Sequence, residues 1–158
     1  MITLSFGDNL GGYMIYKIGN LEKDIKNKKY KYIPKKPGIY RVLNLDNIKI
    51  EFLSYSSNSS FVSYTIIMLQ EKYNKTKVNN LLYVGKGVNL HKRIKQYIEY
   101  GLNLVDNHKG GRAIFQIKDY KNLYIEVLLC DRCECVEKNM LIGYKEHYKE
   151  LPVANMKI

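Results

Sequence analysis

Residues 83–97 combine a glycine-flanked strand exit with side chains that suit phosphate binding. Arg93 and Tyr97 stand four residues apart, so they are neighbours on one face if this segment is helical. An Arg in this position either stacks on its helix neighbour or directs its guanidinium group at a phosphate. Lys86 and Gly87 come just before the expected helix, where free backbone N–H groups also attract anions. Together these residues predict an anion site, although the glycines lack the spacing of a nucleotide-binding P-loop.

Glu137 is a second candidate, because it is a carboxylate on a predicted packing stripe. Leu141, Tyr144 and Tyr148 follow it at spacings that place all four side chains on one side of a helix. A buried carboxylate must be protonated, paired with a cation or bound to a metal. The alternative is an exposed position in the first helical turn, where a negative charge suits the helix dipole. Periodicity alone favours that alternative.

The elements that position these side chains are indicated by periodicity and by turn residues. Strands are predicted over residues 39–45, 48–55, 81–84, 113–117 and 123–129. Helices are predicted over residues 61–73, 90–100 and 135–148, the second of them with Asn89 as its N-cap. Because strands and helices do not alternate regularly, we expect an α+β fold.

The length of 158 residues suits one domain with a single core. Residues 1–36 are interpreted as a basic N-terminal arm or subdomain, and Pro37-Gly38 marks the start of the main fold, residues 37–158. The apolar runs are too short to cross a bilayer, and no hydrophobic leader follows Met1. We therefore expect a cytoplasmic chain with no membrane partner.

The charge of the chain is strongly positive and unevenly distributed. Twenty-six Lys and Arg residues oppose fifteen Asp and Glu residues, which gives a formal net charge of +11. Residues 23–36 hold seven lysines and one acid, Asp24, with Tyr30 and Tyr32 among them. Such a field favours a polyanion, most often nucleic acid. The alternative, a solvated lysine-rich surface, is equally compatible with charge alone.

Cys130, Cys133 and Cys135 form a single cluster, CDRCEC. A structural zinc site usually needs four nitrogen or sulfur ligands, commonly in two separated pairs. His147 is a conceivable fourth ligand, but free thiols are the default in a reducing compartment. A redox or zinc protein is therefore a minor alternative.

Two tripeptides, Gly38-Ile39-Tyr40 and Tyr83-Val84-Gly85, resemble the paired motif that names the GIY-YIG nucleases. The resemblance covers about residues 37–158 and includes a helix after the second tripeptide. The matching positions downstream are Arg93, Tyr97, Glu137 in E-x-x-M-L-x-x-Y, and Asn155 in LPVANM.

The resemblance implies a nuclease that uses Mg²⁺ or Mn²⁺ to hydrolyse phosphodiester bonds in DNA. It implies a three-stranded antiparallel sheet flanked by helices, with Tyr40 and Tyr83 on neighbouring strands and one of them activating water. Tyr40 is the first choice for general base. A free Tyr has a pKa near 10, so this role requires cations that favour the phenolate.

The other roles also come from the resemblance. Arg93 would hold the scissile phosphate and Glu137 would ligate the metal, while Asn155 would support the site. Tyr97 matches a position that assists proton handling. Lys86 and His91 are assigned to the substrate-binding surface.

Two features depart from the usual pattern of the family. Residues 41–82 separate Tyr40 from Tyr83, much more than is common, so an insertion is expected at about residues 44–79. The segment HKGGR resembles a pattern of a bacterial subgroup, in which His108 and Arg112 would reach DNA. The alternative is a tight turn that the two glycines require. The sequence does not choose between these.

The leading hypothesis is thus a metal-dependent DNA endonuclease. Its main rival is a nucleic-acid-binding module of the same fold that does not cut. That rival predicts salt-dependent binding through residues 23–36. The sequence leaves open whether the chain is a monomer or a homodimer.

Overall fold

The computed structural model describes residues 13–77 and 79–158, which form an α+β fold as expected. The strands are β1 (Tyr13–Lys17), β2 (Gly38–Leu43), β3 (Leu81–Gly87) and β4 (Tyr124–Leu129). The helices are α1 (Ile18–Lys26), α2 (Ile66–Thr76), α3 (Leu90–Gly101) and α4 (Cys133–Tyr148). Two short 3₁₀ helices, Arg112–Gln116 and Tyr120–Asn122, precede β4. Within the described ranges no helix is long and apolar enough to cross a membrane.

The sheet has four antiparallel strands in the order β1-β4-β2-β3, so the expectation of three strands is wrong. The additional strand is β1, which pairs with β4 from Tyr13 opposite Leu128 to Lys17 opposite Tyr124. Both β1 and α1 come from the segment interpreted above as a basic arm. The β1 segment, YMIYK, does not alternate between apolar and polar residues, so this pairing had no clear periodic signal in the sequence.

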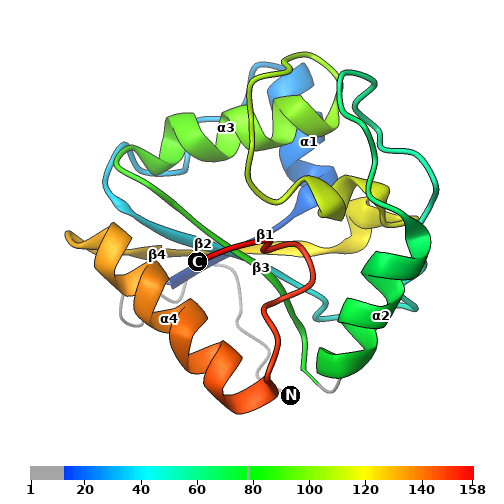
Figure 1. The fold of residues 1–158 in the computed structure, drawn as a ribbon. Coiled ribbons are helices and arrows are strands. Elements are labelled where there is room, and N and C mark those ends of the chain that lie inside the picture. Colours follow the sequence, from blue (N-terminus) through cyan, green and yellow to red (C-terminus); the bar gives the residue numbers. More distant parts are fainter. Residues whose placement is uncertain (1–12, 78) are drawn as a thin grey trace.

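The sheet separates two layers of helices (Figure 1). On one face, Tyr40 and Tyr83 pack with Ile94 of α3 in the large core cluster, to which α1 also contributes. On the other face, Val84 packs with Leu141 of α4 in a smaller cluster. Because successive residues of a strand point to opposite faces, Tyr83 and Val84 serve different layers.

Helix α3 begins where the sequence predicts. Asn89 is its N-cap, and the side-chain oxygen of Asn89 accepts a hydrogen bond of 3.1 Å from the backbone N–H of Lys92. This bond satisfies one of the unpaired N–H groups of the first turn and typically contributes about 1 kcal/mol. The capped start fixes the helical position of Arg93.

Two predicted strands are not strands. Residues 48–55 contribute only an isolated bridge between Phe52 and Ile117, and residues 113–117 lie mostly in a 3₁₀ helix. The two segments are nevertheless joined, by backbone bonds such as Lys118 N–H to the Glu51 carbonyl oxygen (2.8 Å) and by the buried side chain of Gln116. The Gln116 amide nitrogen donates to the carbonyl oxygens of Leu53 (3.0 Å) and Tyr64 (2.8 Å), and its oxygen accepts from the Tyr64 N–H (2.9 Å). These bonds connect the segments without a regular ladder.

The C-terminal residues protect the outer edge of β3, the last strand of the sheet (Figure 1). Ala154 N–H donates to the Leu82 carbonyl oxygen at 3.0 Å. The Asn155 amide nitrogen donates to the Val84 carbonyl oxygen, and its side-chain oxygen accepts from the Val84 N–H, both at 2.9 Å. Unpaired strand edges invite aggregation, so these bonds close part of the edge.

Candidate active site at the edge of the sheet

Three buried tyrosines converge from three elements. Tyr40 of β2, Tyr83 of β3 and Tyr97 of α3 have ring centroids 5.6–5.9 Å apart, within the range of favourable aromatic pairs. The Tyr97 hydroxyl donates a 2.9 Å hydrogen bond to the Gly111 carbonyl oxygen. The Tyr40 hydroxyl is buried and has no hydrogen-bond partner in the described part of the chain. A buried hydroxyl without a partner costs about 1–3 kcal/mol, so it is a candidate for function.

Glycines give these side chains their room. Gly85 lies opposite Tyr40 in the β2–β3 ladder, and a Cβ atom there would lie 2.5 Å from Cζ of the Tyr40 ring. At Gly87, a Cβ atom would lie 2.8 Å from Cβ of Arg93. The first glycine lets the Tyr40 ring cross β3, and the second lets α3 approach the strand end. The glycines of the YVGKG segment therefore shape a site as well as a turn.

Arg93 supplies positive charge to this tyrosine cluster. Its charge opposes the rise in the pKa values of Tyr40, Tyr83 and Tyr97, although burial remains the larger effect on all three. Its guanidinium group forms no ion pair with any acid in 13–77 or 79–158, and hydrogen bonding to Tyr40 helps to lower the pKa of that phenol. A half-buried guanidinium in this state is suited to a phosphate ligand.

Glu137 approaches from the opposite layer. Its side chain is 18% exposed, whereas Glu134, the acid in the first turn of α4, is 85% exposed. Glu137 is therefore a half-buried carboxylate rather than an exposed first-turn residue. Burial raises its pKa, while the charges of Lys86 and Arg93 act in the opposite direction. Arg93 of α3 lies against Gly87 and Glu137 of α4 lies 3.6 Å from Lys86, so the two helices bring opposite charges to neighbouring residues of β3.

Lys86 links the two acids of α4. Its Nζ atom lies 3.6 Å from Oε2 of Glu137 and 3.6 Å from Oε1 of Glu134. Glu134 was not singled out from the sequence, although its place three residues before Glu137 on a helix puts both on one side. The ammonium group thus stands where a cation is electrostatically favoured.

The charges around Tyr40 determine its protonation. Burial raises its pKa, the positive charge of Arg93 lowers it, and the negative charge of Glu137 raises it. At neutral pH the phenol therefore retains its proton. Service as a base requires further positive charge close to the ring.

The acidic residues fit only a metal ion that takes most ligands from elsewhere. Among residues 13–77 and 79–158, no group of three or more His, Cys, Asp or Glu side chains is arranged to hold a metal. Mg²⁺ is commonly held by one or two carboxylates, with waters and substrate phosphates as its remaining ligands. Glu137, with Glu134 beside it, matches that limited donor set.

Asn155 belongs to the site indirectly. Its side chain bonds both backbone groups of Val84, between Tyr83 and Gly85, as described above. Its contacts are with the strand that carries Tyr83 rather than with the tyrosine rings. This geometry gives Asn155 a positioning role.

His91 is occupied by the segment before β2. Its Nδ1 atom lies 3.0 Å from the Ile33 carbonyl oxygen, and the Tyr30 hydroxyl donates to the His91 carbonyl oxygen at 2.8 Å. The Tyr30 and His91 rings also pack with centroids 4.7 Å apart. His91 therefore anchors the basic segment to α3.

The HKGGR segment packs against Tyr97 and Tyr83. His108 is 1% exposed, and its ring packs on Tyr97 with centroids 4.9 Å apart. Burial, aided by the positive charges of Arg93 and Arg112, lowers the His108 pKa to about 3. Arg112 is half-buried, and its Nε donates to the His108 carbonyl oxygen at 2.9 Å.

The two glycines of this segment are required by contacts. Gly111 has φ +68°, and a Cβ atom there would lie 2.7 Å from the Tyr97 hydroxyl. A Cβ atom at Gly110 would collide with the Tyr83 hydroxyl. In this structure the segment follows the tight-turn alternative, and its His and Arg side chains are directed into packing.

The cysteines are in three different environments. Cys133 is buried, Cys130 is half-buried and Cys135 is exposed, and all are free thiols. Burial raises the pKa of the Cys130 thiol. No group suited to metal binding includes them in the described part of the chain, so the zinc alternative gains no support.

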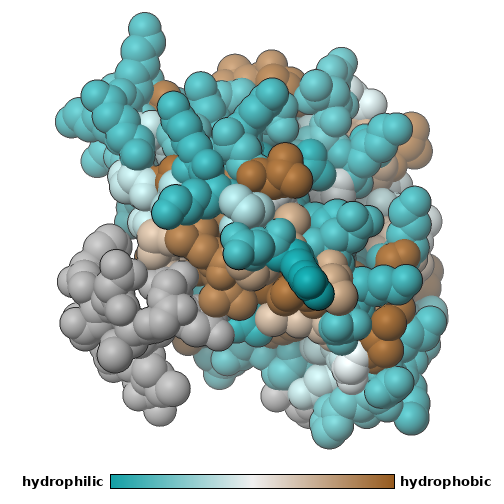
Figure 2. Space-filling view, turned by 90° about the vertical axis from the view of Figure 1, so that its left-hand side faces the viewer, coloured by the Kyte–Doolittle hydropathy of each residue, from teal (hydrophilic) through white to brown (hydrophobic). Residues whose placement is uncertain are grey.

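The surface at this end of the molecule has a distinct pattern. Figure 2 shows the side on which β4 ends and α4 begins, with hydrophobic side chains gathered at the centre and hydrophilic side chains around them. No protein-family model, curated protein or solved structure gives a significant match to this chain.

Proposed function

We propose that the chain is a divalent-metal-dependent endonuclease that hydrolyses phosphodiester bonds in DNA. The observation that carries this proposal is that consecutive residues at the end of β3 lie against the three groups: Gly85 against the Tyr40 ring, Lys86 3.6 Å from Glu137, and Gly87 against Arg93. It agrees with the resemblance to GIY-YIG nucleases in the sequence. A phenol, a guanidinium group and a carboxylate are sufficient to handle a proton, a phosphate and a cation.

Arg93 has the substrate-holding role in this proposal. The planar guanidinium group forms paired hydrogen bonds with phosphate oxygens, and its charge becomes more useful as negative charge grows in the transition state. The close approach of α3 at Gly87 restricts the start of this side chain. Less conformational freedom is then lost when phosphate binds.

Tyr40 is the proposed general base. Its hydroxyl is free to accept a hydrogen bond from an attacking water, since no described residue bonds to it. Tyr83 and Tyr97 surround it with aromatic rings and exclude solvent. Because burial raises the pKa of Tyr40, deprotonation depends on the cations that assemble with the substrate.

Glu137 is the proposed metal ligand, with Glu134 available to bind a metal-bound water. A divalent ion held here would polarise the phosphoryl oxygens and lower the pKa of nearby hydroxyl groups. The raised pKa of Glu137 reflects burial, which a bound cation would counteract. Lys86 would then turn from Glu137 toward the phosphate.

The proposal is tested with supercoiled, linear and branched DNA, incubated with the protein and Mg²⁺ or Mn²⁺. We expect metal-dependent nicking that Glu137→Gln and Arg93→Ala abolish and that Lys145→Gln, on the exposed surface of α4, leaves intact. Absence of nicking with every substrate and metal, or nicking unchanged in the Glu137 and Arg93 variants, would refute the proposal.

The second candidate is a nucleic-acid-binding module that does not cut. One observation favours it: the Lys86 ammonium group pairs with the Glu137 carboxylate, as expected of a carboxylate that does not bind a metal. The two candidates differ in their response to Mn²⁺. Only the endonuclease requires that metal binding be lost in Glu137→Gln, which calorimetric titration of the protein alone measures.

A further inference from the structure

Two adjoining cavities line the exposed side of α1, in a part of the molecule that the proposed active site does not use. One has a volume of about 260 Å³ and the other of about 650 Å³. Lys23 and Asn27 line both cavities, so the two cavities adjoin at these residues. We call the two together the α1 groove and define it by Tyr16, Lys23, Lys26, Lys29, Tyr32 and Lys121.

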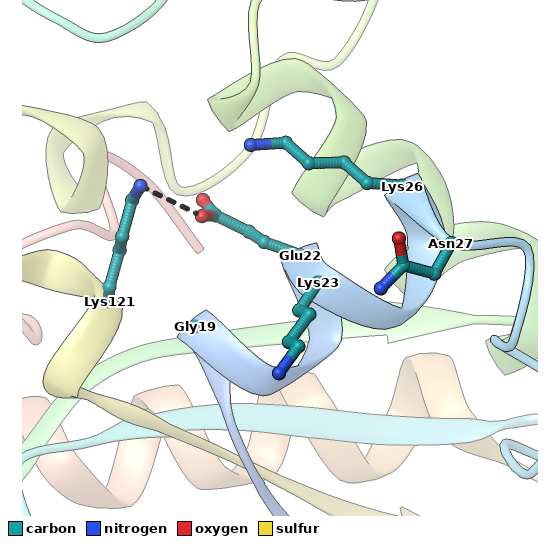
Figure 3. A pocket seen from close by; sticks show the side chains of 6 residues that line it. All are labelled: Gly19, Glu22, Lys23, Lys26, Asn27 and Lys121. Atoms are coloured by element: carbon teal, nitrogen blue, oxygen red, sulfur yellow. Dashed lines mark ion pairs between the residues drawn. The ribbon is translucent and has the colours of Figure 1, made fainter.

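Lysine side chains surround the smaller part of the groove. Figure 3 shows Lys23 and Lys26 extending from α1, with Lys121 approaching from the opposite side. Lys23, Lys26 and Lys29 are exposed and form no ion pair with any residue the structure describes. Three unpaired ammonium groups along one helix and its following loop favour an extended anion.

The acids of this region are already engaged. Glu22 is buried, accepts a 2.6 Å hydrogen bond from the Tyr120 hydroxyl and lies 3.4 Å from the Lys121 ammonium group (Figure 3). Asp24 accepts a 2.6 Å hydrogen bond from the Tyr32 hydroxyl. These acids orient Lys121 and Tyr32, and the five lysines that line the two cavities (Lys17, Lys23, Lys26, Lys29 and Lys121) outnumber the two acids, Glu22 and Asp24.

The larger part of the groove has an aromatic platform. The rings of Tyr16 and Tyr32 stack with centroids 5.0 Å apart and an interplanar angle of 28°. Tyr32 is 39% exposed, although its ring packs on one side against Tyr16. A partly exposed ring among ammonium groups is the combination that holds unpaired nucleotides, whose bases stack while their phosphates meet lysines.

The platform is fixed relative to the helix that carries Arg93. Tyr30 contacts Tyr32 edge-to-face with centroids 5.8 Å apart. Its hydroxyl also donates to the carbonyl oxygen of His91, two residues before Arg93. The groove and the candidate active site therefore share one rigid connection through the start of α3.

We infer that the α1 groove binds an unpaired segment of a nucleic-acid strand, with a base stacked on Tyr32 and the backbone along Lys23 and Lys26. This inference deepens the proposed function, on which it rests, by specifying substrates that have a single-stranded flank. A duplex fits less well, because stacking between successive base pairs hides the faces of its bases.

The test measures binding without cleavage, in EDTA, by fluorescence anisotropy of a labelled oligothymidylate of about ten nucleotides. We expect the single strand to bind more tightly than the matching duplex. Tyr32→Leu should weaken binding to the single strand about tenfold, since stacking is lost, whereas Tyr32→Phe should retain it. Lys23→Gln combined with Lys26→Gln should reduce the slope of log affinity against log salt by about 1.4.

A matched pair of exposed lysines provides the control. Lys49→Gln combined with Lys145→Gln removes the same charge elsewhere and should leave the slope nearly unchanged. Thermal unfolding verifies that each variant is folded. A single strand that carries 5-iodouracil, irradiated on the protein, should crosslink to Tyr32 or Tyr16.

Several results would overturn the inference: equal binding of duplex, no loss in Tyr32→Leu, crosslinks outside the groove, or competition by thymidine monophosphate as strong as that by the oligonucleotide. The last result would indicate a small-ligand pocket instead. A chain that binds as expected but never cuts would contradict only the proposed function. A chain that cuts DNA while Tyr32→Leu has no effect on binding would contradict only this inference.

Discussion

Tyrosine side chains cluster in two regions of this molecule, with different exposure in each. At the β3 edge, Tyr40, Tyr83 and Tyr97 are buried, and burial raises their pKa values. In the α1 groove, Tyr16 and Tyr32 stack in a partly exposed position among lysines. The same side chain is therefore placed to handle a proton in one region and to present a ring face in the other.

The two regions also differ in their tolerance of change. The β3 edge depends on glycines and on a loop that packs against the tyrosines, so small additions there should be costly. The α1 groove consists largely of exposed side chains, so substitutions there should alter binding with little effect on folding. This difference separates the predictions that follow.

The largest expected effect concerns Tyr40 as a base. Tyr40→Phe should lower the rate of DNA cleavage by about 10²–10⁴-fold, the usual contribution of proton transfer. The variant should be as stable as the original chain or more so, because it removes a buried hydroxyl without a partner. Single-turnover cleavage and chemical unfolding measure the two quantities, with Tyr55→Phe, at an exposed residue, as control.

The same assignment predicts a pH dependence. Since the Tyr40 pKa is raised, the reactive phenolate becomes more abundant as pH rises toward that pKa. Cleavage should therefore increase up to about tenfold per pH unit through the neutral and mildly alkaline range. A rate that does not change with pH would remove Tyr40 from the role of base.

A methyl group added to β3 should lower the free energy of unfolding more than one added to α4. Gly85→Ala should destabilise the fold by about 3 kcal/mol, because its Cβ would overlap the Tyr40 ring. Gly143→Ala is the matched control: no atom lies within 4 Å of its Cβ, so it should stabilise α4 by about 0.5–1 kcal/mol. Urea denaturation of both variants measures these two changes in the free energy of unfolding. Equal effects would mean that the Tyr40 ring does not lie across β3.

Asn155 should have an intermediate effect. Asn155→Leu leaves the N–H and C=O groups of Val84 without their side-chain partners at a buried edge. We expect a loss of about 2 kcal/mol in the free energy of unfolding. Amide hydrogen exchange should accelerate at Val84, whereas a catalytic role alone would leave this exchange unchanged.

The last prediction concerns the pH response of His108, which contributes no loss of stability at neutral pH and appears only in acid. Its folded-state pKa of about 3 lies below the ordinary value of 6.5, so the unfolded chain binds more protons between these values. Stability from this residue is present above pH 6.5 and is lost as pH falls, by up to about 1.4 kcal/mol per pH unit. His108→Gln should weaken this dependence, while His147→Gln, at an exposed residue, should not.

Local signals predicted the elements nearest the site. The capping side chain of Asn89 gave the start of α3, and the helical spacing gave the segment that became α4. The paired tripeptides pointed to β2 and β3, whose ladder does place Tyr40 opposite Gly85. The cap and the helical spacing depend on neighbours in sequence, which is why the sequence reveals them, whereas the two paired strands were indicated by the resemblance.

Features that depend on distant partners were missed or left open. The pairing of β1 with β4, and the three loop contacts of Gln116, join residues far apart in the chain. Whether Glu137 is half-buried depends on how α4 packs against β3, and periodicity alone favoured the wrong answer. The stacking of Tyr16 on Tyr32 likewise requires the fold to bring together a strand and a loop.

The most direct test compares one variant from each region, for DNA binding and for cleavage, in the same experiment. Glu137→Gln and the Lys23→Gln/Lys26→Gln double variant are compared for binding to DNA with a single-stranded flank in EDTA, and for cleavage at saturating protein with Mn²⁺. We predict that the Glu137 variant binds normally and fails to cut, whereas the lysine variant binds weakly and cuts normally once saturated. Cleavage that persists in Glu137→Gln at the unchanged rate would contradict the account of the β3 edge.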